Sequence, residues 1–198
     1  CLCPPSYHGS HCQYQTQRVA LSLRFRAFSD SWQTLFAIVV SLIDDSDARV
    51  VHSSEQLTYL SVRDCKTKFH LYLLYANRSK NITHNYAIHI DIFEKSSLAF
   101  RGSVLFPIQF PFLPVHRLAF IVDIRRTDSQ PSTCSERQCV HGTCTMYSNS
   151  PKSFCRCVHG WTGRYCHIQH TCQCSLGSTC LGVSGANNQS ICVCPLHM

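Results

Sequence analysis

Cysteine is the residue type in this 198-residue chain most able to do chemistry, and the chain contains 15 of them. Three lie within residues 1–12 and eleven within residues 134–194, which leaves Cys65 alone between the two groups. Thiols at this density form disulfides in an oxidising compartment or bind zinc, and a single cysteine can act as a nucleophile. Zinc-binding cysteines usually come in C-x2-C pairs, whereas this chain repeats C-x-C, so the spacing favours disulfides.

Six of the cysteines fall in residues 134–166, which read CSERQCVHGTCTMYSNSPKSFCRCVHGWTGRYC. A segment this short cannot bury enough apolar surface to fold by itself. Three disulfides, each contributing about 2–4 kcal/mol, can compensate for the missing core. Six cysteines allow 15 different pairings, and their spacing alone does not choose among them.

The spacing, and above all the ending Cys155-Arg-Cys157-x2-Gly160-Trp161-x-Gly163-x2-Cys166, resembles an epidermal growth factor (EGF)-like module. Residues 172–194 resemble a second such module without its sixth cysteine, and residues 1–12 resemble the last part of another. The resemblance implies six disulfides: Cys134–Cys144, Cys139–Cys155, Cys157–Cys166, Cys172–Cys180, Cys174–Cys192 and Cys3–Cys12. It leaves Cys1 and Cys194 unpaired within this sequence.

The family resemblance also bears on metal binding and glycosylation. Calcium-binding EGF-like modules carry acidic or amide residues before the first cysteine and Asp or Asn after the third, where this chain has QPST at 130–133 and Met146. We therefore predict no metal in this module, and flexible joints around it. Its last loop matches the family pattern for O-linked N-acetylglucosamine at Thr162, with a plain turn threonine as the alternative. Three sequons predict N-glycosylation at Asn77, Asn81 and Asn188.

Residues 14–130, between the cysteine groups, are predicted to form an antiparallel β-sandwich. Apolar and polar residues alternate with the period of a half-buried strand in four segments: 18–27, 69–75, 86–92 and 118–124. The run LFAIVVSLI at 35–43 is apolar on both faces and predicts a central strand. Residues 57–62 and 98–106 are weaker strand candidates. About seven strands separated by turn-rich segments favour a sandwich, and no segment has the periodicity of a helix.

Three prolines interrupt the sequence FPIQFPFLP, at Pro107, Pro111 and Pro114. Proline cannot donate a hydrogen bond to a sheet, so this segment predicts an edge or an irregular crossing. Large apolar residues are usually buried, and we expect its aromatic side chains to pack beneath a loop. The alternative is an exposed binding patch.

The formal charge of +7 is spread along the chain. Residues 14–130 hold 14 Lys/Arg against 10 Asp/Glu, and residues 131–198 hold four against one. The densest basic spot is the pair Arg125-Arg126. This distribution argues against a dedicated nucleic-acid surface and leaves acidic glycans as a partner class.

Other residues with possible chemistry are more simply explained as structural. Asp44, Asp45 and Asp47 could chelate calcium, but a polar turn is the favoured interpretation. His167, His170 and Cys172 could bind a metal, but they join two modules and are expected to form a solvated linker. We expect no metal and no cofactor.

Three further residues lie in the middle segment. His70 and His89 lie on the polar faces of predicted strands and are expected at the surface. Cys65 has no base nearby in the sequence, so we expect a free thiol, or a bond to a cysteine outside this sequence, rather than a nucleophile.

The sequence therefore predicts four parts: the end of a truncated EGF-like module (1–13), a β-sandwich-like domain (14–130), a complete module (131–168) and a truncated one (169–198). The best apolar run has nine residues and a bilayer needs about 20, so we expect the export signal and any membrane anchor to lie outside this sequence. The predicted function is a non-enzymatic, extracellular interaction segment of a cell-surface receptor, adhesion or matrix protein. Its partner would be an extracellular protein or glycan and not a nucleic acid. The alternative is a secreted hydrolase or lectin-like enzyme with its site in residues 14–130.

Overall fold

The computed structural model describes residues 2–4, 7–15, 17–76, 80–110, 112–126, 134, 138–186 and 188–196. Cys1, Asn77 and Pro111 lie outside the described residues, as do residues 130–133. No helix in the described part is long and apolar enough to cross a membrane.

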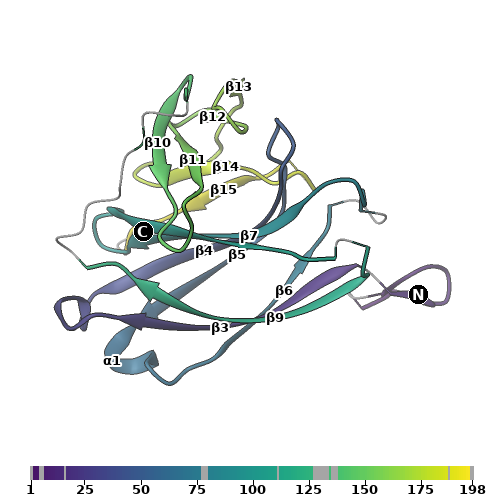
Figure 1. Ribbon diagram of the computed structural model, residues 1–198, viewed down its shortest axis with the longest axis horizontal. Helices are drawn as coiled ribbons and strands as arrows, with labels where there is room; N and C mark the ends of the chain where they lie inside the picture. The colour runs from purple at the N-terminus through teal and green to yellow at the C-terminus, as the bar shows by residue number, and fades with distance from the viewer. Residues whose placement is uncertain are drawn as a thin grey trace.

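The chain is mostly β, as predicted, and its middle part is a sandwich of two sheets (Figure 1). One sheet has four strands in the order β5-β4-β7-β8 and the other has three in the order β6-β3-β9. The strands of the sandwich are β3 (Arg18–Ala27), β4 (Leu35–Asp44), β5 (Val51–Leu60), β6 (Phe69–Leu74), β7 (Tyr86–Glu94), β8 (Phe100–Pro107) and β9 (Val115–Ile124). All seven strand candidates from the sequence correspond to these strands, although β5 begins six residues before the candidate at 57–62. Two short helical turns, η1 (Ser29–Ser31) and α1 (Ser61–Asp64), connect strands.

The sandwich core is built by the alternation seen in the sequence. Val19, Leu21, Leu23 and Phe25 of β3 are at most 2% exposed, and they face the inner residues of β4 and β7 across the sandwich. Tyr59 lies between the sheets with its ring near Phe25 and Phe36, and its hydroxyl donates to the Phe25 carbonyl. These contacts close the end of the sandwich next to α1.

One pairing differs from an antiparallel sandwich, because β3 and β9 run parallel in register from Arg18–Val115 to Ala27–Ile124. The chain crosses from the four-stranded to the three-stranded sheet between β8 and β9, through the proline-rich segment. That segment is an irregular crossing, as predicted, and Ile108 is buried in it. The packing prediction is wrong for Phe110 and Phe112, which are 59% and 65% exposed at the outside of the crossing.

The disulfide-bonded segments carry short two-stranded sheets of their own. The head segment (residues 2–15) pairs β1 (Tyr7–His8) with β2 (Tyr14–Gln15). The six-cysteine module (Cys134 and residues 138–170) pairs β10 (Gly142–Met146) with β11 (Ser153–Cys157), and β12 (Trp161–Thr162) with β13 (Ile168–Gln169). The tail module (residues 171–196) pairs β14 (Thr179–Val183) with β15 (Ser190–Val193).

Six disulfides hold these segments, and each joins the pair that the family resemblance implies. The bonds are Cys3–Cys12, Cys134–Cys144, Cys139–Cys155, Cys157–Cys166, Cys172–Cys180 and Cys174–Cys192. Cys65 and Cys194 form no disulfide within the described residues.

The six-cysteine and tail modules lie on the outer face of the four-stranded sheet (Figure 1). Ala37 and Val39 of β4 and Phe93 of β7 form a second apolar cluster there with Ile191 and Val193 of the tail module. This cover explains why β4 is apolar on both faces. The packing of the tail module on this sheet also differs from the flexible joints that the missing calcium ligands predict.

Polar contacts fasten the modules to the same sheet. The side chain of Asn149 bonds to both the N–H and the carbonyl of Leu105 on edge strand β8, at 2.9 Å each. Gly185 donates its N–H to the Val51 carbonyl at 2.7 Å, and a methyl group on Gly185 would lie 2.4 Å from the Val50 side chain. Backbone groups at the edges of a sheet need partners, and here the modules supply them.

Candidate functional site

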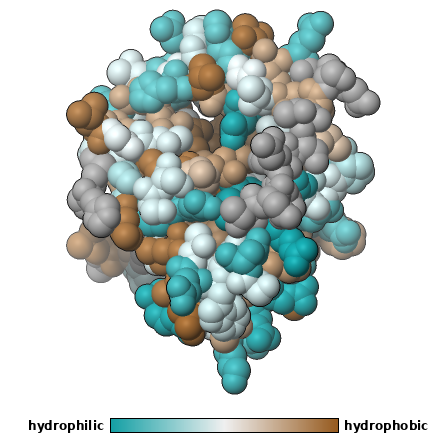
Figure 2. All heavy atoms as spheres, turned by 90° about the vertical axis from the view of Figure 1, so that its left-hand side faces the viewer, coloured by the Kyte–Doolittle hydropathy of each residue, from teal (hydrophilic) through white to brown (hydrophobic). Residues whose placement is uncertain are grey.

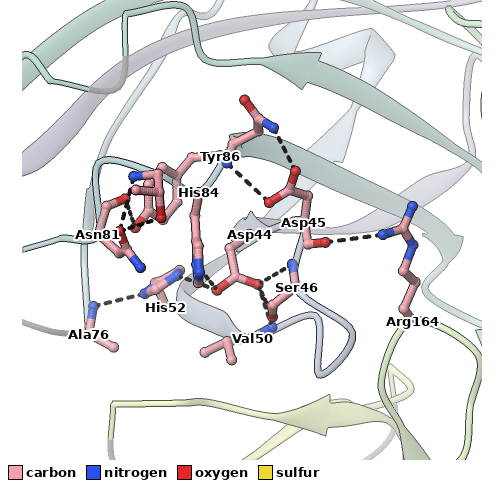
Figure 3. Close-up of polar contacts among 12 residues, drawn as sticks. Asp44, Asp45, Ser46, Val50, His52, Ala76, Asn81, His84, Tyr86 and Arg164 are labelled. Atoms are coloured by element: carbon pink, nitrogen blue, oxygen red, sulfur yellow. Dashed lines mark hydrogen bonds and ion pairs between the residues drawn. The ribbon is translucent and has the colours of Figure 1, made fainter.

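A cluster of polar side chains surrounds Asp44, at the end of β4 (Figure 3). Its Oδ1 accepts hydrogen bonds from the backbone N–H groups of Ser46 and Val50 and from the Ser46 hydroxyl. Its Oδ2 lies 3.4 Å from His52 Nε2 and 3.6 Å from His84 Nδ1. Burial alone would raise the pKa of Asp44, but the bonds from His52, Ser46 and Val50 outweigh burial and hold the pKa at about 2.

The histidine partner of Asp44 is held in one tautomer. His52 is buried, and its Nδ1 accepts the backbone N–H of Ala76 at 3.2 Å. The remaining ring nitrogen, Nε2, then carries the proton and faces the carboxylate. The neighbouring Asp45 carboxylate accepts the backbone N–H and side-chain amide of Asn85. Asp44 therefore acts as the acceptor of its own turn, in line with the polar turn that the sequence favoured, and Asp45 joins this turn to the residue before β7.

A groove of about 710 Å³ opens beside this cluster, between the end of the sandwich and the six-cysteine module. Asp44, Asp45, Tyr86, Lys152 and Arg164 are among the residues that line it. Asp44 keeps its charge throughout the physiological range, so it cannot serve as a general acid there. Cys65, the candidate nucleophile of an enzyme, follows α1 at the opposite end of the sandwich (Figure 1).

A second polar network lies beneath the modules, around His89 of β7. The prediction that His89 is a surface residue is wrong: it is 5% exposed, because the modules cover the polar face of β7. His89 Nδ1 lies 3.1 Å from Arg49 Nη2 and from the Tyr147 hydroxyl, and its Nε2 lies 2.9 Å from Asp91. Arginine can only donate, so Nδ1 accepts and the ring is neutral. Burial correspondingly lowers the pKa of His89.

The outer face of the three-stranded sheet carries no such cover among the described elements (Figure 1). We call it the open face. It consists of the outward-pointing residues of β3, β6 and β9 together with Lys68: Arg18, Ala20, Ser22, Arg24, Arg26, Lys68, His70, Tyr72, Leu74, Val115, Arg117, Ala119, Ile121 and Asp123. Tyr72 is 62% exposed and Ile121 is 54% exposed. His70 is exposed, as predicted, and bonds to the Ser22 hydroxyl at 2.9 Å.

Two grooves of about 390 Å³ and 380 Å³ lie on the open face. Both are lined by Ser22, His70 and Ala119, so they meet over the middle of β3. One reaches Arg18, Tyr72 and Arg117, and the other reaches Arg24 and Lys68. Ala20, Ser22 and Ala119 are small, which leaves the space that the longer side chains border. The result is an elongated trough with cationic groups toward both ends.

The cations of the open face are only partly engaged within the chain. Arg26 forms a two-bond ion pair with Asp123 at 2.7 and 2.9 Å, exposed to solvent. Arg18 lies 5.8 Å above the Tyr72 ring, and its Nε and Nη1 are buried without a hydrogen-bond partner in the described part of the chain. Lys68 and Arg117 form no hydrogen bond or ion pair within the described residues. Lys68 and Arg117 are exposed and are therefore free to meet an external acceptor.

The end of the molecule near the β3–β4 connection has no single large apolar patch. Phe28, Trp32 and Val62 are each about half exposed there. In Figure 2 the apolar groups seen from this end are small and separated by polar surface. The exposed apolar groups on this end are therefore ordinary for a protein surface.

The remaining candidate residues are not brought together into a site. His170 Nε2 lies 3.1 Å from Cys172 Sγ and 3.6 Å from Cys180 Sγ, but these two sulfurs are bonded to each other. Metal ligation needs thiolates, which a disulfide does not supply. His167 is exposed and does not belong to this group.

The glycosylation candidates differ in their surroundings. Asn81 and Asn188 are exposed, in keeping with glycan attachment, whereas Asn77 lies outside the described residues. Thr162 is half-buried and lines a cavity of about 80 Å³ between the modules and the sheet. Its Oγ1 would lie 3.4 Å from a methyl group on Gly182 of the tail module, so a sugar on Thr162 would contact that module.

Comparison with known proteins yields little. No family model matches the sequence, and no curated protein matches it. One solved structure that matches is described as an alternative pilotin from the type II secretion system of Vibrio cholerae. It is 15% identical, the alignment covers 57% of this chain and 99% of the pilotin chain, and the TM-score is 0.41. At that TM-score the likeness carries no argument about fold or function.

Proposed function

We propose that this chain is a non-enzymatic interaction segment of a larger extracellular protein, of the cell-surface receptor, adhesion or matrix type with EGF-like modules. Six disulfides indicate an oxidising environment, which is that of secreted proteins and ectodomains. In this proposal the open face of the sandwich binds an extracellular protein or glycan. The modules brace the opposite sheet and connect the sandwich to the rest of the parent protein.

The observation that carries the proposal is the difference between the two outer faces of one sandwich. The modules cover the face of the four-stranded sheet and bury both its apolar cluster and the polar network around His89, while the open face is charged and grooved. A rigid sheet positions side chains more accurately than a loop, which suits recognition. The open face is also large enough to present several side chains to one partner.

The alternative is a secreted hydrolase or lectin-like enzyme, with the groove beside Asp44 as its site. The engagement of Asp44 by turn donors, its low pKa and the distance to Cys65 all favour the non-enzymatic proposal. The hydrolase alternative predicts that Asp44→Asn abolishes an activity on an extracellular substrate. The interaction proposal predicts that Asp44→Asn leaves partner binding intact.

An N-glycan attached to the open face tests the proposal directly. Ala20→Asn completes a sequon with Ser22 in the middle of the trough, on a side chain that points outward. We expect the glycosylated variant to fold and be secreted, because the sugar projects into solvent. We also expect it to lose binding to cells that bind the wild-type chain, as measured by flow cytometry with the purified, fluorescently labelled chain.

The matched control places the same sugar far from the open face. Leu176→Asn completes a sequon with Ser178 at a side chain that is 97% exposed in the tail module. This variant should bind cells like the wild type. The proposal is contradicted if the Ala20→Asn protein, shown to be folded and glycosylated, binds as well as the Leu176→Asn control, or if the wild-type chain binds no cell surface.

A further inference from the structure

We propose that the open face binds a sulfated polysaccharide, with the chain of sugars lying along β3. This inference rests on the proposed function and names the chemistry of its partner. The charge of the face, the shape of the trough and the groups that border it all fit such a ligand.

The charge of the open face is concentrated there by the fold. The face carries five cationic side chains and one carboxylate: Arg18, Arg24, Arg26, Lys68 and Arg117 against Asp123. More than half of the formal charge of +7 therefore lies on one side of one sheet. A surface of one dominant sign attracts an oppositely charged polymer and raises its rate of association.

The shape of the trough fits a linear ligand. The two grooves share Ser22, His70 and Ala119, and their outer ends reach Arg18 on one side and Arg24 on the other. Six residues of extended strand separate these two arginines, a distance of roughly 20 Å. A single small anion would fill only part of this length, whereas a polymer with repeated anionic groups can contact both ends.

The chemistry of the bordering groups fits sulfated sugars. Guanidinium groups present planar, forked donors that match tetrahedral and carboxylate oxyanions, and the exposed Arg117 guanidinium forms no hydrogen bond or ion pair in the described structure. Tyr72 offers an exposed ring beside Arg18, on which the apolar face of a sugar can pack. The hydroxyl of Ser22 lies on the floor of the trough and can bond to sugar hydroxyls.

Other polyanions fit less well with the rest of the molecule. The disulfides indicate an oxidising compartment, whereas DNA and RNA binding is chiefly intracellular. Anionic phospholipids are concentrated in the cytoplasmic leaflet, on the side of the membrane where disulfides are rare. Sulfated polysaccharides are abundant polyanions on the side where the disulfides place this chain.

The test measures binding of the full chain to immobilised heparin by surface plasmon resonance. The variant Lys68→Gln/Arg117→Gln removes two cations that form no hydrogen bond or ion pair in the described structure, so it should fold normally. We expect its affinity for heparin to fall about tenfold. The matched control, Lys95→Gln/Lys152→Gln, removes two lysines outside the open face and should change affinity by less than about twofold.

Three further probes show which source of anionic charge the chain prefers. They are chemically desulfated heparin, single-stranded DNA, and phosphatidylcholine vesicles carrying phosphatidylserine. The proposal predicts that desulfated heparin, DNA and vesicles all bind more weakly than heparin. It is overturned if the folded wild-type chain does not bind heparin, if DNA or vesicles bind equally well, or if the two double variants behave alike.

A cell-binding measurement distinguishes failure of this inference from failure of the proposed function. Cells are treated with enzymes that remove sulfated polysaccharides, and binding of the wild-type chain is measured before and after. Loss of binding supports the inference. Undiminished binding overturns the polysaccharide assignment and leaves the interaction function standing with a protein partner, whereas no binding to untreated cells contradicts both.

Discussion

The two outer faces of the sandwich are both formed by β-strands, but only one of them is covered by the modules. On the four-stranded sheet, the outward side chains Ala37, Val39 and Phe93 pack against the tail module, and the polar His89 lies beneath the six-cysteine module. On the three-stranded sheet, most outward side chains of β3 and β9 are charged or small, and they meet solvent together with Ile121. An outward strand position therefore reports what covers it: apolar residues meet the tail module on one face, and mainly cationic residues meet solvent on the other.

The largest expected effect comes from placing the same charge on the two faces. Val39 of β4 is 1% exposed beneath the tail module, whereas Ile121 of β9 is 54% exposed on the open face. Val39→Asp buries an unpaired carboxylate and should lower the free energy of unfolding by about 3–5 kcal/mol. Ile121→Asp should cost about 1 kcal/mol or less, through strand propensity alone.

Chemical denaturation with intrinsic fluorescence measures both values. Equal losses of stability in the two variants would mean that the modules do not cover the four-stranded sheet. Loss of heparin binding in the stable Ile121→Asp variant would strengthen the assignment of the open face, because the new carboxylate lies among its cations.

A smaller difference in acid stability is expected between Asp44, at the end of β4 in the covered sheet, and Asp123 on the open face. The pKa of Asp44 is about 2 in the folded chain, below its ordinary value of 3.8, because of the bonds from His52, Ser46 and Val50. The unfolded chain therefore takes up this proton first as the pH falls. The stabilisation from Asp44 is complete above about pH 4 and is lost as the pH falls toward 2, and it amounts to about 1–2 kcal/mol.

Thermal unfolding at a series of pH values from about pH 5 down to about pH 2, where Asp44 becomes protonated in the folded chain, measures this dependence. Asp44→Asn should lower stability at pH 5 and flatten the loss below pH 4. The control Asp123→Asn removes an exposed carboxylate of the open face and should keep the wild-type acid profile. An Asp44→Asn variant with an unchanged acid profile would show that the turn does not depend on the ionised carboxylate.

Much of this fold could be predicted from the sequence, because alternation and cysteine spacing are local signals. The four alternating segments and the apolar run at 35–43 all form strands of the sandwich. The parallel pairing of β3 with β9 could not be predicted, since it joins residues about 97 positions apart through an irregular crossing. The cover over β7 could not be predicted either, and for that reason His89 was expected at the surface.

The open face could not be predicted from the sequence either, because it also depends on how distant strands pair. Arg18, Arg24 and Arg26 alternate with apolar residues, and Arg117 lies far away in the chain, so no run of basic residues appears. Their convergence depends on the register in which β9 pairs with β3. Asn149, which bonds to the edge of β8, has no sequence signal of its own because its role depends on where the module docks.

The most direct test of the contrast between the covered and the open face is covalent footprinting of the full chain, with and without heparin. A small photoactivated carbene labels side chains that solvent reaches, and mass spectrometry locates the label. The account predicts labelling of Tyr72 and Ile121 in the free chain, its loss when heparin is added, and no labelling of Val39 or Phe93 in either state. Labelling of Val39 and Phe93 comparable to that of Ile121, or unchanged labelling of Tyr72 with heparin bound, would contradict it.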